Sequence, residues 1–146
     1  MELNIILIED EPDTCEMIET WLEDLGRKPQ VKTFSMGASA LEFMEQEMAK
    51  GPASDRFVPD LVILDLKLPD QSGLEVLKKM KLSKALKNIE VIVNSAADDP
   101  ESLRNTYKFG GCIFIQKKGE PKLLLDAIRR LMMAGRVRRP DELRAL

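Results

Sequence analysis

The sequence predicts an α/β fold in which a five-stranded parallel sheet carries helices on both faces. Short apolar runs alternate with stretches of helical spacing from one end of the chain to the other. The connections between these segments are short. Strict alternation of this kind builds a parallel sheet, because each helix brings the chain back to the end of the sheet where the previous strand began. The 146 residues have the length of one domain and contain no repeat or low-complexity segment.

Five segments have the composition of strands. The first, third and fourth are near-continuous apolar runs, typical of central strands covered on both faces, whereas the second alternates and suits an edge. This pattern favours the flavodoxin-like, doubly wound strand order 2-1-3-4-5, whose ligand crevice lies beyond the carboxyl ends of the first and third strands. The five segments are residues 3–8 (LNIILI), 31–34 (VKTF), 61–64 (LVIL), 89–93 (IEVIV) and 112–115 (CIFI).

The first two helices have recognisable ends. The first should start near Pro12 and stop at Gly26, since proline is favoured in a first turn and glycine just past a helix end. The second should be capped by Ser35 and end before Gly51.

The remaining three helices follow the same rules. Ser72 and Glu75 have the spacing of a capping box at the start of the third. The fourth should be capped by Asp99 and run to Gly110, and the fifth should start at Pro121. The apolar side chains expected to face the sheet are Ile18, Leu22, Leu25, Leu41, Met44, Met48, Leu77, Met80, Leu124, Ile128 and Leu131.

Composition excludes several classes of protein. A net charge of -3, with 44% hydrophobic and 32% charged residues, is typical of a soluble globular protein without a global attraction to nucleic acid. The apolar run 3–8 is too short for a signal peptide or a membrane span, which predicts a cytoplasmic protein with no membrane contact. Cys15 and Cys112 lie far apart and fit no metal-ligand spacing, so we expect reduced, buried thiols.

Polar residues follow the carboxyl ends of the central strands. Glu9 and Asp10 come after the first strand, Asp65 after the third, Ser95 after the fourth and Lys117 after the fifth. Taken singly, each has an ordinary explanation as a turn, cap or surface residue. Their coincidence at corresponding strand ends, which meet at one edge of a parallel sheet, favours a functional site instead.

The residue types at this edge indicate phosphoryl chemistry. Three carboxylates brought together repel one another unless a cation offsets the charge, and Mg²⁺ prefers such oxygen ligands. A lysine and a hydroxyl supply donors for phosphoryl oxygens, while a carboxylate can attack phosphorus and form an aspartyl phosphate. The sequence therefore predicts a phosphoryl-accepting site.

Four stretches carry a family resemblance. In this order and spacing, ILIEDEP, LVILDLKLPDQSG, VIVNSAADD and FIQK closely resemble the receiver domain of two-component response regulators, over residues 3 to 134. The resemblance implies that Asp65 is the phosphoacceptor. It also implies that Glu9, Asp10 and Asp65 hold Mg²⁺ together with the main-chain carbonyl of Lys67.

The resemblance further implies a switch. Ser95 would occupy the switch hydroxyl position, Phe114 the switch aromatic position and Lys117 the position of the lysine that contacts the phosphoryl group. A histidine kinase or phosphotransfer protein would supply the phosphoryl group. The surface formed by the fourth helix, fifth strand and fifth helix would transmit the signal, and two copies of the chain could form a homodimer through this surface. Such a module is no enzyme beyond its own phosphorylation and dephosphorylation.

Three features differ from the usual family pattern. Lys118 follows Lys117 at a position where the family usually has proline. Asn94 stands where an apolar residue is usual, and residues 47–59 form a longer connection to the third strand than is typical. The long connection and the missing proline resemble the small stand-alone receivers that partner bacterial phytochromes.

The chain divides into a receiver domain at 1–134 and a basic tail or linker at 135–146, in which four arginines outnumber two acids. A solvated tail is the preferred interpretation over an arm that binds a partner, and nucleic acid is not expected to bind this chain alone. Alternative functions are a pseudo-receiver that serves as a protein-interaction scaffold, a Mg²⁺-dependent phosphohydrolase, and a flavin-binding electron carrier. The phosphohydrolase would require an acid where Lys67 stands, and the flavin carrier would require a less acidic first loop.

Overall fold

Five parallel strands form one sheet in the order β2-β1-β3-β4-β5, which confirms the predicted topology. The computed structural model describes residues 3–26, 29–52, 54–96, 100–108, 112–117 and 119–137, apart from the side chains of Ser102 and Cys112. None of the side chains of β2 is buried, as expected for the alternating edge strand. The strands are β1 (Asn4–Ile8), β2 (Gln30–Phe34), β3 (Leu61–Leu64), β4 (Glu90–Ser95) and β5 (Cys112–Gln116).

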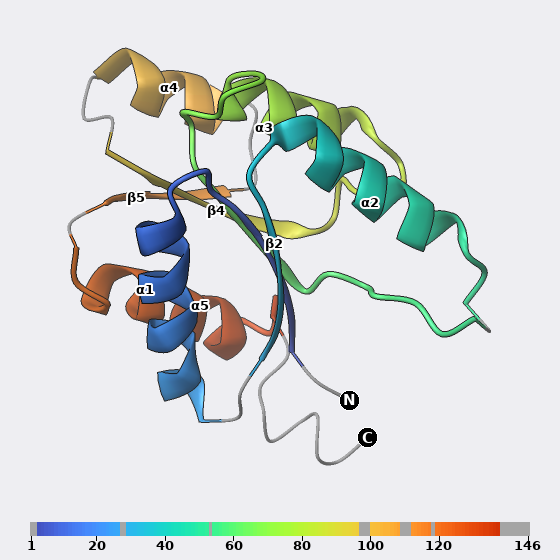
Figure 1. Cartoon of the computed structure of the whole chain (residues 1–146), viewed down its shortest axis with the longest axis horizontal. Helices are drawn as coiled ribbons and strands as arrows, with labels where there is room; N and C mark the ends of the chain where they lie inside the picture. Colours follow the sequence, from blue (N-terminus) through green and yellow to red (C-terminus); the bar gives the residue numbers. More distant parts are fainter. Residues whose placement is uncertain are drawn as a thin grey trace.

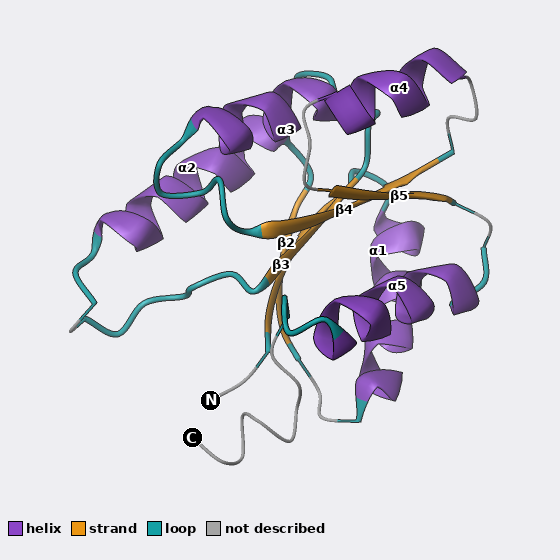
Figure 2. Cartoon of the chain, turned by 180° about the vertical axis from the view of Figure 1, so that it is seen from behind, coloured by secondary structure: helices purple, strands orange, loops and turns teal. Residues whose placement is uncertain are grey.

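Helices cover both faces of the sheet (Figures 1 and 2). Helices α1 and α5 lie on one face, and α2, α3 and α4 lie on the other. The first helix continues through a 3₁₀ turn, η1 (Glu23–Leu25), and stops at Gly26, whose φ of 100° only glycine adopts easily. The predicted cap Asp99 and end Gly110 of the fourth helix lie outside the described residues. The helices are α1 (Pro12–Leu22), α2 (Gly37–Ala49), α3 (Gly73–Leu82), α4 (Pro100–Lys108) and α5 (Lys122–Met133).

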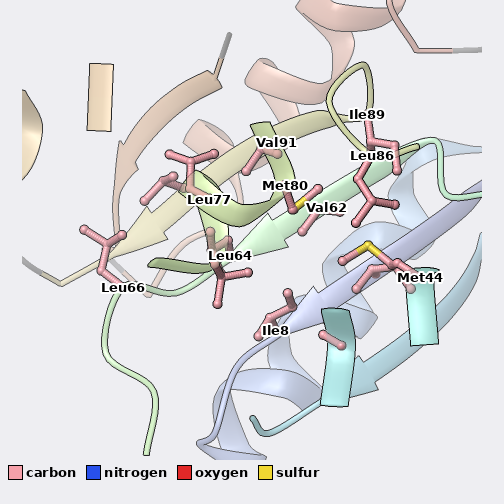
Figure 3. Close-up of a cluster of buried hydrophobic side chains, with 14 of the residues drawn as sticks. Ile8, Met44, Val62, Leu64, Leu66, Leu77, Met80, Leu86, Ile89 and Val91 are labelled. Carbon is pink, nitrogen blue, oxygen red and sulfur yellow. The ribbon is translucent and has the colours of Figure 1, made fainter. Parts of the chain in front are cut away.

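The core consists of two apolar layers, because successive side chains of a strand point to opposite faces. Ile5 and Leu7 pack with α1 and α5, whereas Ile6 and Ile8 pack with α2 and α3. Figure 3 shows the second layer, in which Met44 of α2 lies over the strands. The helix residues predicted to face the sheet are buried or half-buried, the fully buried ones being Ile18, Leu22, Met44, Leu77, Met80 and Ile128.

Of two predicted helix caps, Ser72 of α3 is confirmed and Ser35 of α2 is not. Ser72 caps α3, since its Oγ accepts a hydrogen bond from the N–H of Leu74 at 3.1 Å. The prediction of Ser35 as the cap of α2 is wrong. The N-cap position is Met36, whose side chain makes no capping hydrogen bond. The free N–H groups at the start of α2 are instead bonded by a carboxylate from the loop after β3, as described below.

The segment after α5 folds back onto the sheet. Gly135 has a φ of 72°, and the N–H groups of Arg136 and Val137 donate to the carbonyl of Leu131 at 2.9 and 3.2 Å. Val137 is buried in the layer formed with α1 and α5, although the predicted tail begins at residue 135. The boundary after residue 134 stays a prediction. Among the described residues, no helix has both the length and the apolar character needed to cross a bilayer.

Candidate phosphoryl-accepting site

The predicted polar residues lie at the carboxyl ends of the strands, along one edge of the sheet. Glu9 follows β1, Asp65 follows β3, Ser95 ends β4 and Lys117 follows β5. Backbone hydrogen bonds fix these ends to one another. The N–H of Asp65 donates to the carbonyl of Ile8 at 3.0 Å, that of Lys117 to the carbonyl of Ser95 at 2.8 Å, and that of Glu9 to the last carbonyl of β2 at 2.9 Å.

Three carboxylates and one ammonium group meet at this edge. Glu9, Asp10 and Asp65 each offer a carboxylate oxygen, and these oxygens lie within 4.8 Å of one another. Glu9 and Asp65 are buried, whereas Asp10 is exposed. The Nζ of Lys117 lies 2.6 Å from Oε1 of Glu9 and 3.5 Å from Oδ2 of Asp65. The structure therefore brings these four side chains together, as the sequence predicts.

Burial and charge act in opposite directions on the ionisation of this group. Desolvation by burial raises the pKa of Glu9, and the hydrogen bond from Lys117 lowers this pKa. The nearby negative charge of Asp65 raises it further, so that the pKa of Glu9 lies above its ordinary value. Burial alone would lower the pKa of Lys117, but the Glu9 hydrogen bond and the charges of Asp65 and Glu9 raise it above its ordinary value. Lys117 thus keeps its positive charge beside the acids.

A close approach of α3 holds the loop after Asp65. The N–H of Gly73 donates to the carbonyl of Leu66 at 2.8 Å. A Cβ atom at Gly73 would lie 2.2 Å from the carbonyl oxygen of Asp65 and 2.7 Å from Cα of Leu66, so only glycine fits. Within the loop, the N–H of Lys67 donates to Oδ1 of Asp65 at 3.4 Å. The predicted use of the Lys67 carbonyl as a metal ligand stays a prediction.

The two predicted switch residues lie on β4 and β5. Ser95 is fully buried at the end of β4, and Asn94 beside it is also buried. Phe114 is half-buried and packs against the layer formed with α2 and α3. It pairs in register with Val93, two residues before Ser95. Lys118, which takes the place of the usual proline, lies outside the described residues.

Two further residues belong to this region: Asp70, whose role the sequence does not indicate, and Cys15, which the sequence predicts only as a reduced, buried thiol. Both carboxylate oxygens of Asp70, in the loop after β3, accept hydrogen bonds at 2.9 Å from the N–H groups of Gly37 and Ala38. These bonds, that of Ala38 foremost, lower the pKa of Asp70 below its ordinary value. Asp70 thus caps α2 from the loop that begins at Asp65. No local pattern identifies this role, because the partners lie 33 and 32 residues apart.

The second is Cys15, a free, half-buried thiol whose Sγ lies 3.4 Å from the carbonyl oxygen of Glu9, to which it donates. Burial, followed by the negative charges of Glu9, Glu19 and Asp10, raises the pKa of this thiol to about 11. Cys15 was expected to be buried and is only partly so. The side chain of Cys112 lies outside the described residues.

Comparisons with known proteins agree with the fold. Within the curated relatives, the chain is 32% identical over 103 residues to the probable methanogenesis regulatory protein FilR2 of Methanothrix harundinacea (strain 6Ac), covering 70% of this chain and 64% of that protein. The chain therefore spans less than two thirds of that relative.

Two solved structures are similar over nearly their whole length. The phosphorylated cyanobacterial phytochrome response regulator RcpA has a TM-score of 0.74 and 28% identity, with 90% of this chain and 92% of that chain covered. The bacteriophytochrome response regulator AtBRR has a TM-score of 0.70 and 31% identity, with 88% and 91% covered. The predicted likeness to phytochrome-partner receivers is confirmed. A model of the response regulator receiver domain matches residues 5–129, so this chain belongs to the receiver domain family of two-component signalling.

Proposed function

We propose that this receiver domain accepts one phosphoryl group on Asp65 and thereby controls a signalling surface. The observation that carries the proposal is the position of the Asp65 carboxylate, which is buried, lies among the carboxylates of Glu9 and Asp10, and is 3.5 Å from the Lys117 ammonium. A buried acid placed between like charges and one cation is a poor stabilising element, since crowded carboxylates repel. The arrangement is well suited to an incoming phosphoryl group and a divalent cation.

The donor set fits a hard cation. All its donors are oxygen atoms, which Mg²⁺ requires, and the exposure of Asp10 leaves room for the waters that this ion retains. Glu9, Asp10, Asp65 and the main-chain carbonyl of Lys67 would hold the ion. When bound, it would neutralise charge on the oxygens of the transferred phosphoryl group.

The proposed donor is a phosphohistidine of a histidine kinase or phosphotransfer protein. A carboxylate oxygen of Asp65 attacks phosphorus, the bond from phosphorus to the imidazole nitrogen breaks, and the imidazole leaves. Lys117 contacts a phosphoryl oxygen and stays charged there because its pKa is raised. Hydrolysis of the aspartyl phosphate by water returns the free carboxylate and inorganic phosphate.

The output is a change in the surface formed by α4, β5 and α5. Contact between the phosphoryl group and the hydroxyl of Ser95 would favour a state in which Phe114 turns inward. That surface would bind a downstream partner or a second copy of the chain. We place the protein in the cytoplasm, with residues 1–134 as the receiver domain and 135–146 as a tail, and with neither a membrane nor a nucleic acid as its partner.

The test is incubation with Mg²⁺ and acetyl phosphate, followed by the mass of the intact protein. The wild type should gain one phosphoryl group, and Asp65→Asn should gain none. Asp55→Asn, which removes an exposed acid from the loop before β3, serves as the matched control and should label like the wild type. Labelling of Asp65→Asn would contradict the assignment of the acceptor. A folded wild type that is never labelled would favour the scaffold function instead.

A further inference from the structure

Two surfaces of opposite charge lie on opposite faces of the sheet. From Glu9 to Asp24, through α1, the sequence contains eight acidic residues and no basic residue. From Val76 to Ile89, through the end of α3 and the loop after it, it contains five lysines and no acidic residue. Helices α1 and α3 lie on opposite sides of the sheet in Figure 1. Although the net charge of the chain is only -3, negative charge is concentrated around α1 and positive charge around the end of α3.

The basic surface consists of Lys78, Lys79, Leu82, Lys84 and Lys87, all of which are exposed. In α3, Val76, Leu77 and Met80 face the core, so the helical period places the side chains at 78, 79 and 82 on the solvent side. Leu82 is 77% exposed, which makes it one of the most exposed large apolar side chains in the described part of the chain. A single exposed leucine is ordinary, but this one lies within a group of lysines.

Few acidic groups among the described residues compensate the charge of these lysines. In the part of the chain that the structure describes, the ion pairs of the protein involve none of the four exposed lysines of the basic surface. Lys79 donates to the side-chain oxygen of Gln71 at 3.2 Å, which leaves its charge unpaired. Glu75 lies in the first turn of the same helix, and the carboxylate of Glu45 in α2 accepts a hydrogen bond from Ser83 at 2.8 Å. Positive charge is thus left for an external partner.

The acidic surface, formed by residues 9–24 on and around α1, contains a shallow hollow. A hollow of about 330 Å³ on α1 is lined by Met17, Thr20 and Trp21, with the carboxylates of Asp13 and Glu16 beside them. Its apolar side chains can cover a leucine, and its carboxylates can pair with lysines that flank the leucine. Further along the helix, Glu23 extends the negative charge.

We propose that α1 of one copy of this chain docks on the basic surface of a second copy, with Leu82 in the hollow beside Trp21. Lys78, Lys79 and Lys84 then face the carboxylates of α1, so that burial of the leucine adds to the electrostatic attraction. The chain itself offers both halves of this contact, in charge and in apolar character, which favours a second copy over nucleic acid or a lipid surface. Because the two halves differ, the contact is head-to-tail and builds rings or open chains rather than two-fold dimers.

This inference requires neither a metal nor phosphorylation, so its test uses the unphosphorylated protein. Sedimentation velocity should show reversible association of the wild type at low ionic strength. The association should weaken at least about tenfold between about 0.05 M and 0.5 M salt, since ions screen contacts between exposed charges. Trp21, the single tryptophan of the chain, should show a fluorescence change over the same range.

Charge reversal provides a sharper test. Lys78→Glu/Lys79→Glu and Glu16→Lys/Glu23→Lys should each be monomeric, because each variant sets like charges against each other. An equimolar mixture of the two should associate again, since opposite charges then meet at every contact. Glu42→Lys, an exposed substitution on α2 outside both surfaces, is the matched control and should associate like the wild type.

Three outcomes would overturn the proposal. The first is a wild type that stays monomeric at low salt up to millimolar concentration. The second is association of either double variant to the same extent as the wild type. The third is binding of a DNA duplex or of phosphatidylserine vesicles that is lost in Lys78→Glu/Lys79→Glu while the wild type does not self-associate, which would assign the basic surface to a polyanion. Circular dichroism of each variant establishes that it is folded.

Discussion

Gly73→Ala should damage both the fold and the candidate site, because α3 begins against the backbone of the residue that we propose as phosphoacceptor. The added Cβ would lie 2.2 Å from the carbonyl oxygen of Asp65, and an ordinary contact of 3.4 Å requires a shift of about 1.2 Å. The obstacles are backbone atoms, and the N–H of Asp65 is itself bonded to the carbonyl of Ile8 at 3.0 Å. Rotation of a side chain cannot relieve this clash.

The size of the effect follows from two terms. Overpacking of a close contact costs about 1–3 kcal/mol, and loss of the Gly73 hydrogen bond to Leu66 costs about 1 kcal/mol. Alanine returns up to about 1 kcal/mol, because it is the better helix former. We therefore expect a net loss of about 2 kcal/mol, or a fall of about 1 M in the urea midpoint for a domain of this size. Labelling of Asp65 by acetyl phosphate should also slow, since its loop must move.

The assay is urea unfolding followed by circular dichroism, combined with intact-mass labelling. Gly51→Ala is the matched control: no heavy atom lies within 4 Å of a Cβ built there, so its midpoint should be unchanged or slightly higher. If Gly73→Ala unfolded at the wild-type midpoint and labelled at the wild-type rate, the close approach of α3 to Asp65 would not be a constraint on the site.

Three other predictions concern polar side chains at the site or beside it. Asp10→Ala should weaken Mg²⁺ binding at least about tenfold in a calorimetric titration. Lys117→Gln should strengthen Mg²⁺ binding, because it removes a cation that competes for the same carboxylates. Unchanged Mg²⁺ affinity in both variants would place the ion elsewhere. Ser95→Ala should keep the labelling of Asp65 but lose the phosphorylation-dependent amide NMR shifts of residues 112–117, and retention of those shifts would exclude the hydroxyl as the coupling group. Cys15, with a pKa raised to about 11, should be alkylated at pH 8 about a hundredfold more slowly than a thiol of pKa 9.0, measured in a variant whose other cysteine is replaced by serine. Because the fold favours the protonated thiol, this contribution to stability is present below pH 9 and is lost as the pH rises through 11; rapid alkylation at pH 8 would contradict the burial of the thiol.

The strand order and the meeting of four site residues could be predicted from sequence for a simple geometric reason. The strands are parallel, so the residues that follow them lie at the same end of the sheet. Glu9, Asp10, Asp65, Ser95 and Lys117 each stand within two residues of the end of an easily recognised apolar run. Glu9, Asp65 and Lys117 are therefore placed by the topology, without knowledge of any side-chain contact. The same reasoning gives no atomic detail, such as the pairing of Lys117 with Glu9 at 2.6 Å rather than with Asp65 at 3.5 Å.

Helix caps show where local reasoning fails. Ser72 caps α3 from the adjacent position, and its spacing made it recognisable. The cap of α2 is a carboxylate brought from another loop, and Ser35, although serine is a preferred capping residue, is not used. A cap supplied from a distant segment depends on the tertiary fold, so it becomes visible only when the β3–α3 loop and the start of α2 are placed side by side.

The pairing of Lys117 with Glu9 links the two halves of the proposed chemistry. Without a divalent cation, the ammonium group of Lys117 offsets the buried carboxylates of Glu9 and Asp65, and burial still raises the pKa of Glu9 above its ordinary value. A cation bound by the carboxylates would take over the oxygen atoms of Glu9 and weaken its attraction for Lys117. The ammonium group would then be free to contact a phosphoryl oxygen on Asp65, which it already approaches. Metal binding and phosphoryl contact by Lys117 are in this way coupled, because both depend on the same carboxylate.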